Sequence, residues 1–263
     1  MELTEKNFLD LYYLAKKLGL FFISTPLDIP SVKFLEKFAD CLKISSADID
    51  YYPLVEAIKK TKKPVIISTG MSDLKRISHT YRNFSHLKKN KIGLLHCISS
   101  YPALRKDINL KCITTLKKKF NATIGYSDHS IGLDACISAV ALGAKIIEKH
   151  FTLDKNFSNF RDHSLSADPN DMEKLVLGIK NIESMTSNYS KFLSEDEKVN
   201  KEIMRRHPFA KKNIKKGEII DYRNIKFLRP KFPSKPVNLN LFLGKKINRN
   251  IDKNSLVKLE YLT

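Results

Sequence analysis

Two apolar segments that each end in a histidine decide the fold, Ala122-Thr-Ile-Gly-Tyr-Ser-Asp-His129 and Ala144-Lys-Ile-Ile-Glu-Lys-His150. The two histidines are 21 residues apart, and the stretch between Gly132 and Gly143 is patterned as a helix. A strand, a helix and a second strand of this length form a right-handed βαβ unit. We therefore expect both imidazoles at the carboxyl edge of a parallel sheet, where α/β folds place their chemistry.

Strand-like and helix-like segments alternate on both sides of this unit. We expect strands at residues 20–24, 42–45, 65–68, 93–96, 123–126 and 145–149, and helices near 4–18, 31–38, 53–61, 73–87, 110–119, 133–142 and 169–189. Runs such as Pro64-Val-Ile-Ile-Ser68 are continuously apolar, as strands buried on both faces should be. Six consecutive βα units predict a parallel barrel or an open doubly wound sheet. No G-x-G-x-x-G motif follows a strand, which counts against a dinucleotide-binding fold.

The pattern changes toward the carboxyl end of the sequence. Residues 190–204 are charged and weakly patterned, and we interpret them as a linker. From Arg205 onward, short alternating strands are separated by turn residues. The sequence thus predicts an α/β domain over residues 1–189, a linker over 190–204 and a small β-rich domain over 205–263.

The chain has 263 residues and a formal charge of +19, from 47 basic and 28 acidic residues. Such a charge attracts polyanions. The basic residues are nevertheless spread along the chain without an aromatic-interleaved stripe, so we expect no nucleic-acid partner. A general positive field still favours anionic substrates such as phosphates.

Cysteine usage and hydropathy point to the compartment. The four cysteines lack paired spacing, which indicates buried thiols in a reducing environment rather than a disulfide or zinc framework. No signal peptide opens the sequence, and no apolar run reaches about 18 residues. We expect a cytoplasmic protein without a membrane partner.

Nearly every expected strand ends in a polar cluster. Hydroxyls, one lysine and histidines that converge at one edge are what a phosphate and a metal ion would require. A lone histidine at a strand end is more often a structural residue. We interpret His79, His86, His163 and His207 as surface or structural residues. The clusters are Ser24-Thr-Pro26, Lys43-Ile-Ser-Ser46, Ser68-Thr-Gly-Met71, His96-Cys-Ile-Ser99, Ser127-Asp-His129 and Glu148-Lys-His150.

Taken in order, these strings resemble the sialic acid synthase family, which makes nonulosonic acids from phosphoenolpyruvate and an N-acetylated amino sugar. The resemblance runs over essentially the whole chain and includes Leu94-Leu-His-Cys97 and Glu148-Lys-His-Phe-Thr152. The last part resembles the family's antifreeze-like (SAF) domain through Ile214-Lys-Lys-Gly-Glu218 and Leu243-Gly244. The resemblance implies an incomplete (β/α)8 TIM-type barrel, with six of its eight βα units, followed by a small β-rich SAF domain.

The resemblance also implies roles for individual residues. His129 and His150 would bind a divalent metal, usually manganese, with magnesium or cobalt as alternatives. Lys43 and Asp48 would be catalytic, and Asp162 and Arg205 would bind the sugar. Arg205, or its neighbour Arg206, would reach into the partner subunit of a domain-swapped homodimer. The residues around phosphoenolpyruvate would be Thr25, Lys43, Ser46, Ser68, Ser99, Tyr101 and Ser127.

This sequence departs from the family pattern in three places. Family members carry a further stretch ahead of Met1 that holds the first two barrel strands, and six strands cannot close an eight-stranded barrel without exposing two edges. We therefore keep open a fragment of a longer product, a barrel completed by a partner, and a catalytically inactive remnant that acts as a binding or partner subunit. A further hypothesis is a protein that binds nucleic acid through its positive charge alone.

The other two departures face the sugar in the family. Asp48 stands where relatives commonly have glutamate, and Asn159-Phe-Arg-Asp-His163 replaces a Gly-Pro-Asp loop. The amino sugar therefore stays open among N-acetylmannosamine, its 6-phosphate and the diamino precursors of legionaminic or pseudaminic acid.

Overall fold

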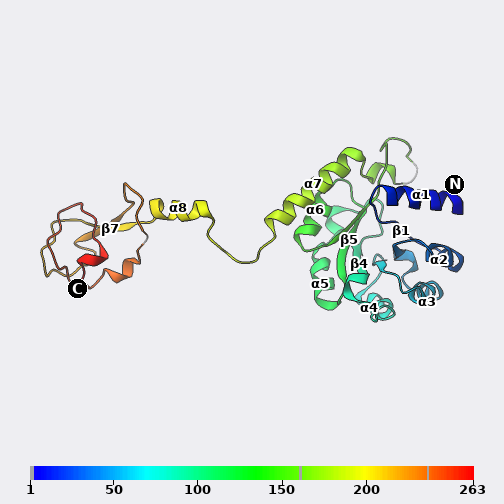
Figure 1. Cartoon of the computed structure of the whole chain (residues 1–263), viewed down its shortest axis with the longest axis horizontal. Helices are drawn as coiled ribbons and strands as arrows, with labels where there is room; N and C mark the ends of the chain where they lie inside the picture. The colour runs from blue at the N-terminus through cyan, green and yellow to red at the C-terminus, as the bar shows by residue number, and fades with distance from the viewer. Residues whose placement is uncertain (1–2, 160–161, 236) are drawn as a thin grey trace. The chain divides into compact units, whose positions relative to one another are not determined.

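The chain divides into two compact units, Met1–Asn188 (unit 1) and Tyr189–Thr263 (unit 2) (Figure 1). The structure is a computed structural model that describes residues 3–159, 162–235 and 237–263. None of the helices in these ranges is long and apolar enough to cross a membrane.

Unit 1 is built on one sheet of six parallel strands that lie in chain order. The order leaves β1 and β6 at the two edges, and it confirms the incomplete parallel barrel expected from the sequence. The central strands β3 and β4 are buried along their whole length, as their apolar runs predict. The strands are β1 (Ile23–Ser24), β2 (Cys41–Ile44), β3 (Val65–Ser68), β4 (Ile92–Cys97), β5 (Thr123–Asp128) and β6 (Ile146–Lys149).

A helix follows each of the six strands, and helices surround the sheet in Figure 1. Asp28, Asp73 and Asp168 cap the amino ends of three of these helices through their carboxylates. The helices of unit 1 are α1 (Glu5–Lys17), α2 (Ile29–Leu35), α3 (Tyr52–Lys60), α4 (Leu74–Arg82), α5 (Lys111–Lys119), α6 (Asp134–Ala141) and α7 (Pro169–Met185). Short 3-10 helices lie at Ser46–Asp48, Lys89–Lys91, Arg105–Asp107 and His163–Leu165.

The core of unit 1 joins the strands to the inner faces of the helices, for example Leu42 and Leu94 to Leu54 and Ile113. The strands also approach closely on their other face. A Cβ on Gly125 of β5 would lie 2.5 Å from the carbonyl oxygen of Ile146 in β6. Glycine at this position therefore lets β6 pack tightly beside β5.

Unit 2 is a small domain with its own core, which includes Ala210, Ile220 and Phe242. Its two antiparallel strands are β7 (His207–Ala210) and β8 (Ile225–Leu228), and isolated bridges such as Ile214 to Ile251 add further pairing. Two short 3-10 helices lie at Leu239–Leu241 and Leu259–Tyr261.

Part of the segment interpreted as a linker is helical, because α8 (Glu195–Met204) begins five residues into it. The side chains of Ser194 and Glu197 form a capping box at its first turn. This local signal starts a helix that has no buried residue and few apolar ones, which is why the hydrophobic pattern does not reveal it.

Candidate active site

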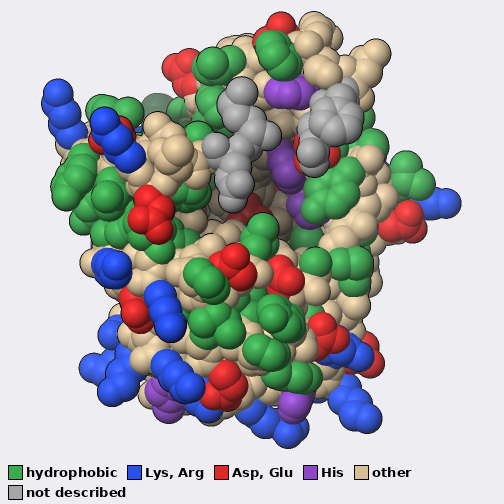
Figure 2. Space-filling view, turned by 90° about the vertical axis from the view of Figure 1, so that its right-hand side faces the viewer, with side chains coloured by type: hydrophobic (Ala, Val, Ile, Leu, Met, Phe, Trp, Pro, Cys, Tyr) green, Lys and Arg blue, Asp and Glu red, His purple; other side chains and the backbone are tan. Residues whose placement is uncertain are grey.

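His129 and His150 meet at the carboxyl edge of the sheet. They follow directly on Asp128 and Lys149, the last registered pair between β5 and β6. Their ring centroids are 5.2 Å apart and the rings are inclined at 65°. The structure thus places the two imidazoles side by side on neighbouring strands, as the βαβ spacing predicts. Figure 2 shows a hollow in this unit with histidine side chains along one wall.

Each of these histidines has a partner for its Nδ1 atom. Nδ1 of His129 lies 2.7 Å from the carbonyl oxygen of Ile98, and Nδ1 of His150 lies 3.5 Å from Oδ2 of Asp162. A carbonyl or carboxylate on Nδ1 is the usual companion of a metal-binding histidine, because it orients the ring and leaves Nε2 as the ligand atom.

The separation of the two rings fits a shared ion. Imidazoles that bind one cation through Nε2 at about 2.1–2.2 Å, with a ligand angle of about 90–109°, have centroids roughly 4.6–5.4 Å apart. The 5.2 Å observed falls inside that range. Within residues 3–159, 162–235 and 237–263, no group of three or more His, Cys, Asp or Glu side chains could hold a metal. The protein would therefore offer two ligands and leave the other positions to water or substrate.

Tyr101 covers the histidine pair. Its ring centroid lies 4.1 Å from that of His129, at an interplanar angle of 32°, and 5.8 Å from that of His150. The Tyr101–Pro102 peptide bond is cis. Half of the tyrosine surface is exposed, so the ring stands between the imidazoles and solvent.

The surroundings shift the pKa values of the two imidazoles in opposite directions. Burial lowers the pKa of His150, and the neighbouring His129 lowers it further, which favours the neutral form that a metal requires. Burial also acts to lower the pKa of His129, but its contacts with the Cys97 thiol and the Ile98 carbonyl outweigh this and raise it. The Sγ atom of Cys97 lies 3.7 Å from Nδ1 of His129.

Beside the histidines, Glu148 links two residues that the sequence assigns to the site. Its Oε1 accepts a 2.7 Å hydrogen bond from the Ser127 hydroxyl and lies 3.4 Å from Nζ of Lys43. Lys43 and Thr25 line a cavity of about 500 Å³ together with Glu148. Sequence reasoning gave no role to Glu148, although it stands in the same strand-end cluster as His150. Its position inside that cluster is the signal that could have found it.

A second group of hydroxyls gathers around Gly70, just after β3. The Gly70 N–H donates a 3.0 Å hydrogen bond to Oγ of Ser46, and a Cβ at Gly70 would fall 2.2 Å from Oγ of Ser99. Ser68, two residues earlier, is 2% exposed, and its Oγ has no hydrogen-bond partner among the described residues. Buried hydroxyls are nearly always satisfied, so an unpaired one points to a ligand.

Three further residues that the sequence assigns to the site, Asp48, Asp162 and Arg205, lie outside the hydroxyl group around Gly70. Asp48 accepts a hydrogen bond from Ser45 within its own loop, and no described contact joins it to the histidines. Asp162 lies beside the histidine pair, with its Oδ2 atom 3.5 Å from Nδ1 of His150. Arg205 belongs to unit 2, where it is exposed at the end of α8. Residues 160 and 161 of the atypical loop lie outside the described residues.

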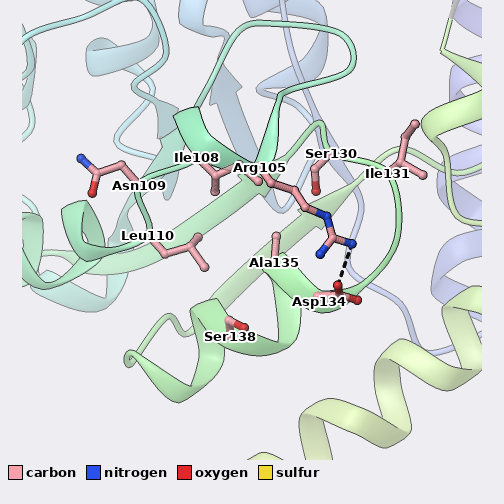
Figure 3. Close-up of a pocket in the computed structure, with 9 residues that line it drawn as sticks. All are labelled: Arg105, Ile108, Asn109, Leu110, Ser130, Ile131, Asp134, Ala135 and Ser138. Carbon is pink, nitrogen blue, oxygen red and sulfur yellow. Dashed lines mark ion pairs between the residues drawn. The ribbon is translucent and has the colours of Figure 1, made fainter.

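A separate cavity of about 310 Å³ lies between the loop after β4 and α6 (Figure 3). Arg105 reaches across it to Asp134 at 2.8 Å, with side chains 78% and 69% exposed. An ion pair this exposed contributes little to stability. No histidine lines this cavity, so the cavity lacks the chemistry of the site at the strand ends.

Comparison with known proteins identifies the family of this chain. The NeuB family model matches residues 1–191, and the SAF domain model matches residues 209–262. An uncharacterised protein of Methanocaldococcus jannaschii is 43% identical over 98% of this chain and 76% of its own length. The N,N'-diacetyllegionaminic acid synthase of Campylobacter jejuni is 38% identical over 98% of this chain and 78% of its own length.

Among solved structures, the N-acetylneuraminic acid (sialic acid) synthetase of Leptospira borgpetersenii, crystallised with citrate, is 37% identical. Its TM-score is 0.70, over 75% of this chain and 69% of that one. The match of the family model to most of the chain, together with these identities, makes the assignment secure. The chain belongs to the NeuB family, is an enzyme of the synthase type, and carries a SAF domain.

Proposed function

We propose that this protein condenses phosphoenolpyruvate with an N-acetylated amino sugar and water, and releases phosphate. The observation that carries the proposal is the pair of imidazoles at the strand ends, 5.2 Å apart, with each Nδ1 engaged by a carbonyl or a carboxylate. This pair stands beside a lysine and several serine hydroxyls on one edge of the sheet. Such a combination suits a substrate that carries both a phosphate and a carboxylate.

His129 and His150 would hold a divalent cation, which we propose to be manganese. Both are nitrogen ligands of the borderline class that such ions accept. When bound, the ion supplies Lewis-acid polarisation of the aldehyde of the open-chain sugar. The two imidazoles contribute by fixing where that aldehyde lies.

Lys43 and the serine hydroxyls would hold phosphoenolpyruvate. The Lys43 ammonium would neutralise an anionic group. Ser46 and Ser99 beside Gly70, together with the buried Ser68, would supply hydroxyl donors. The methylene carbon of the enol forms a bond to the sugar aldehyde carbon, whose C=O π bond opens to leave an alkoxide oxygen. Water adds at the enol carbon and gives up one proton, which balances the proton that the alkoxide takes up to become a hydroxyl. The carbon–oxygen bond to phosphate then breaks as this carbon becomes a ketone, and the second proton of the water leaves with the phosphate. The site residues orient the two substrates and stabilise the charges that develop.

We further propose that the sugar contacts Asp162 and that Arg205 is donated by a second copy of the chain. Asp162 is half-exposed beside His150, so its carboxylate is available to sugar hydroxyls. The relatives are named as synthases of different acids, N,N'-diacetyllegionaminic acid in one case and N-acetylneuraminic (sialic) acid in the other. The choice of amino sugar is therefore the part of the proposal that a substrate panel must decide.

The test is phosphate release by the purified full chain, supplied with phosphoenolpyruvate, Mn²⁺ and a panel of amino sugars. The panel contains N-acetylmannosamine, its 6-phosphate and the diacetamido precursors of legionaminic and pseudaminic acid. We expect release that requires both substrates, with one sugar clearly preferred. Release without any sugar, or none with the whole panel, would contradict the proposal.

The matched variants are His129→Ala and His79→Ala. His79 also makes an edge-to-face ring contact, with Tyr52 at 5.0 Å, but it lies on α4 away from the strand ends. We expect His129→Ala to lower the rate by at least about 100-fold, since a metal ligand is lost, and His79→Ala to leave it unchanged. Equal rates for both variants would remove the metal role from His129.

A further inference from the structure

A buried ion pair lies directly behind the two histidines. Nζ of Lys149 is 2.8 Å from Oδ2 of Asp128, and the two side chains are 2% and 0% exposed. Asp128 immediately precedes His129, and Lys149 immediately precedes His150. Residues next to each other in a strand point to opposite faces, so this pair lies on the face opposite to the imidazoles.

The Asp128 carboxylate is fully satisfied. Oδ1 accepts hydrogen bonds from the N–H of Ser130 at 2.9 Å, from its hydroxyl at 2.7 Å and from the Tyr126 hydroxyl at 3.0 Å. Oδ2 accepts from Lys149 and, at 3.2 Å, from the thiol of Cys136 in α6. Lys149 also donates to the Ser130 carbonyl. The network therefore binds β5, β6 and α6 together on the helix side of the sheet.

Stability alone gives no reason for this network. A buried ion pair recovers its desolvation cost only with difficulty, and apolar residues of similar volume often stabilise a protein equally well or better. Buried polar groups are instead suited to fixing one arrangement among several similar ones. The arrangement in question here is the register of β6 against β5.

The register of β6 is weakly fixed by hydrophobicity. Among the described residues this strand is the last of the sheet, pairs with β5, and is half-buried along its whole length. On its other side one isolated parallel bridge, between Phe151 and Ala167, follows the end of the strand. A slip of one residue would turn every β6 side chain to the other face and move His150 away from His129. The slip would also move the Lys149 ammonium away from Asp128, to the face of the sheet that carries the histidines. Because the slip breaks the buried ion pair, the ion pair makes the shifted register less stable than the observed one.

We propose that the Asp128–Lys149 ion pair is a positioning element that fixes the register of β5 and β6 and thereby holds the imidazoles of His129 and His150 side by side. This inference rests on the function proposed above, because the consequence of the positioning is a competent cation site. The proposal gives neither residue a direct contact with the ion, because their side chains are 2% and 0% exposed and pair with each other.

The test compares Mn²⁺ affinity with fold stability in the full chain. The variant is Asp128→Asn combined with Lys149→Met, which removes both charges and keeps the volumes and most bonds to Ser130. Mn²⁺ binding is measured by titration calorimetry and stability by urea unfolding. We expect Mn²⁺ to bind roughly 10–100-fold more weakly, the range found when the supporting contacts of ligands are removed, with an unfolding midpoint at or above that of the natural chain.

The matched control is Lys16→Met combined with Asp40→Asn. This pair is also a lysine–aspartate bridge in unit 1, but it joins α1 to the residue ahead of β2 and is partly exposed. The control should bind Mn²⁺ as the natural chain does. A milder variant, Tyr126→Phe, deletes one donor to Asp128 and keeps the ion pair, and it should weaken Mn²⁺ binding a few-fold even if the double variant fails to fold.

The outcomes separate the two proposals. A natural chain that binds no Mn²⁺ overturns the proposed cation site and this inference with it. A natural chain that binds Mn²⁺, with unchanged affinity in whichever of the two variants folds, overturns the positioning role alone. Weaker binding in the control pair to the same extent also overturns it, because the effect would then be one of general destabilisation.

Discussion

The ammonium group of Lys43 lies 3.4 Å from the carboxylate of Glu148, although their strands are not neighbours. Lys43 is on β2 and Glu148 is on β6, and three strands separate them in the sheet. Side chains can meet across that span because the sheet curls on itself. The contact therefore brings the two halves of the strand-end edge into one site.

Replacing Lys43 should cost binding of the phosphate-bearing substrate. For Lys43→Met we expect kcat/KM for phosphoenolpyruvate to fall on the order of 100-fold, because a charge-assisted contact is lost and Glu148 is left without its cation. Steady-state kinetics with varied phosphoenolpyruvate measure this. Lys63→Met is the control, since Lys63 bonds the Ala39 carbonyl at the other end of the sheet and should leave kcat/KM unchanged. A normal kcat/KM in Lys43→Met would refute the role.

Ser68→Ala should separate stability from binding. The Ser68 hydroxyl is buried and has no partner among the described residues, so its removal should leave the free energy of unfolding unchanged or slightly higher. The KM for phosphoenolpyruvate should rise about 3–10-fold, as expected for one lost hydrogen bond. Urea unfolding and kinetics on the same sample test both halves. A loss of stability without a change in KM would show that the hydroxyl serves the fold.

Gly70→Ala should damage the site because of a direct clash. The new Cβ would lie 2.2 Å from Oγ of Ser99 and 2.9 Å from Oγ of Ser46, so both hydroxyls must move. We expect kcat/KM to fall by at least about 10-fold in a folded protein, given how sensitive catalysis is to small displacements.

Gly178→Ala in α7 is the matched control for this substitution. Its Cβ would meet Cδ1 of Ile137 at 2.9 Å, which is the end of a flexible side chain. Alanine also favours helix, so the control should keep full activity and similar stability. If Gly70→Ala were as active as this control, the hydroxyls around Gly70 would have no part in the reaction.

The stability of unit 2 should fall at acid pH because of His207. This residue is the one histidine in residues 189–263, it is 3% exposed, and its Nε2 has no hydrogen-bond partner among the described residues. Burial lowers its pKa in the folded state. Below about pH 6.5 the unfolded chain takes up a proton that the folded unit refuses, so stability decreases as pH falls, by at most about 1.4 kcal/mol per pH unit.

Guanidinium unfolding of the full chain at pH 5 and pH 7.5 tests this, with unit 2 amide signals followed by NMR. Carboxylates also contribute to the pH dependence of stability, so the His207→Leu variant is needed to isolate the part that His207 causes. We expect the variant to lose less stability than the natural chain between the two pH values. An identical loss in both proteins would exclude His207 as the cause.

The sequence predicts the strands well where they are buried on both sides. Val65–Ser68 forms β3 over the expected residues, because an apolar run between Pro64 and Thr69 has clear limits. At the edge of the sheet, the strand expected over residues 20–24 is shorter and covers Ile23–Ser24, because β1 pairs with β2 alone among the described strands. β5 continues to Asp128, two residues past the apolar pattern, since its polar side chains find partners inside the fold.

Helix ends were harder to predict than helix positions. The helix expected over residues 73–87 ends at Arg82 as α4, and the side chain of Asn83 bonds the carbonyls of His79 and Thr80. Such side-chain bonds compete with helical ones and are invisible to hydrophobic periodicity.

In the site, sequence pattern could place the histidines because their spacing and their strands define one edge. It could not find the contact between Lys43 and Glu148, which exists through the curl of the sheet. Nor could it single out Asp128 and Lys149, since burial distinguishes them from the many charged residues that face solvent.

The strands β5 and β6 carry the two imidazoles on one face of the sheet and the Asp128–Lys149 ion pair on the other. The loop that bears Asp162, which we propose to contact the sugar, contributes no residue to the Asp128–Lys149 ion pair. Substitutions in such a loop could therefore change the proposed sugar preference without altering the strand pairing that sets the distance between His129 and His150.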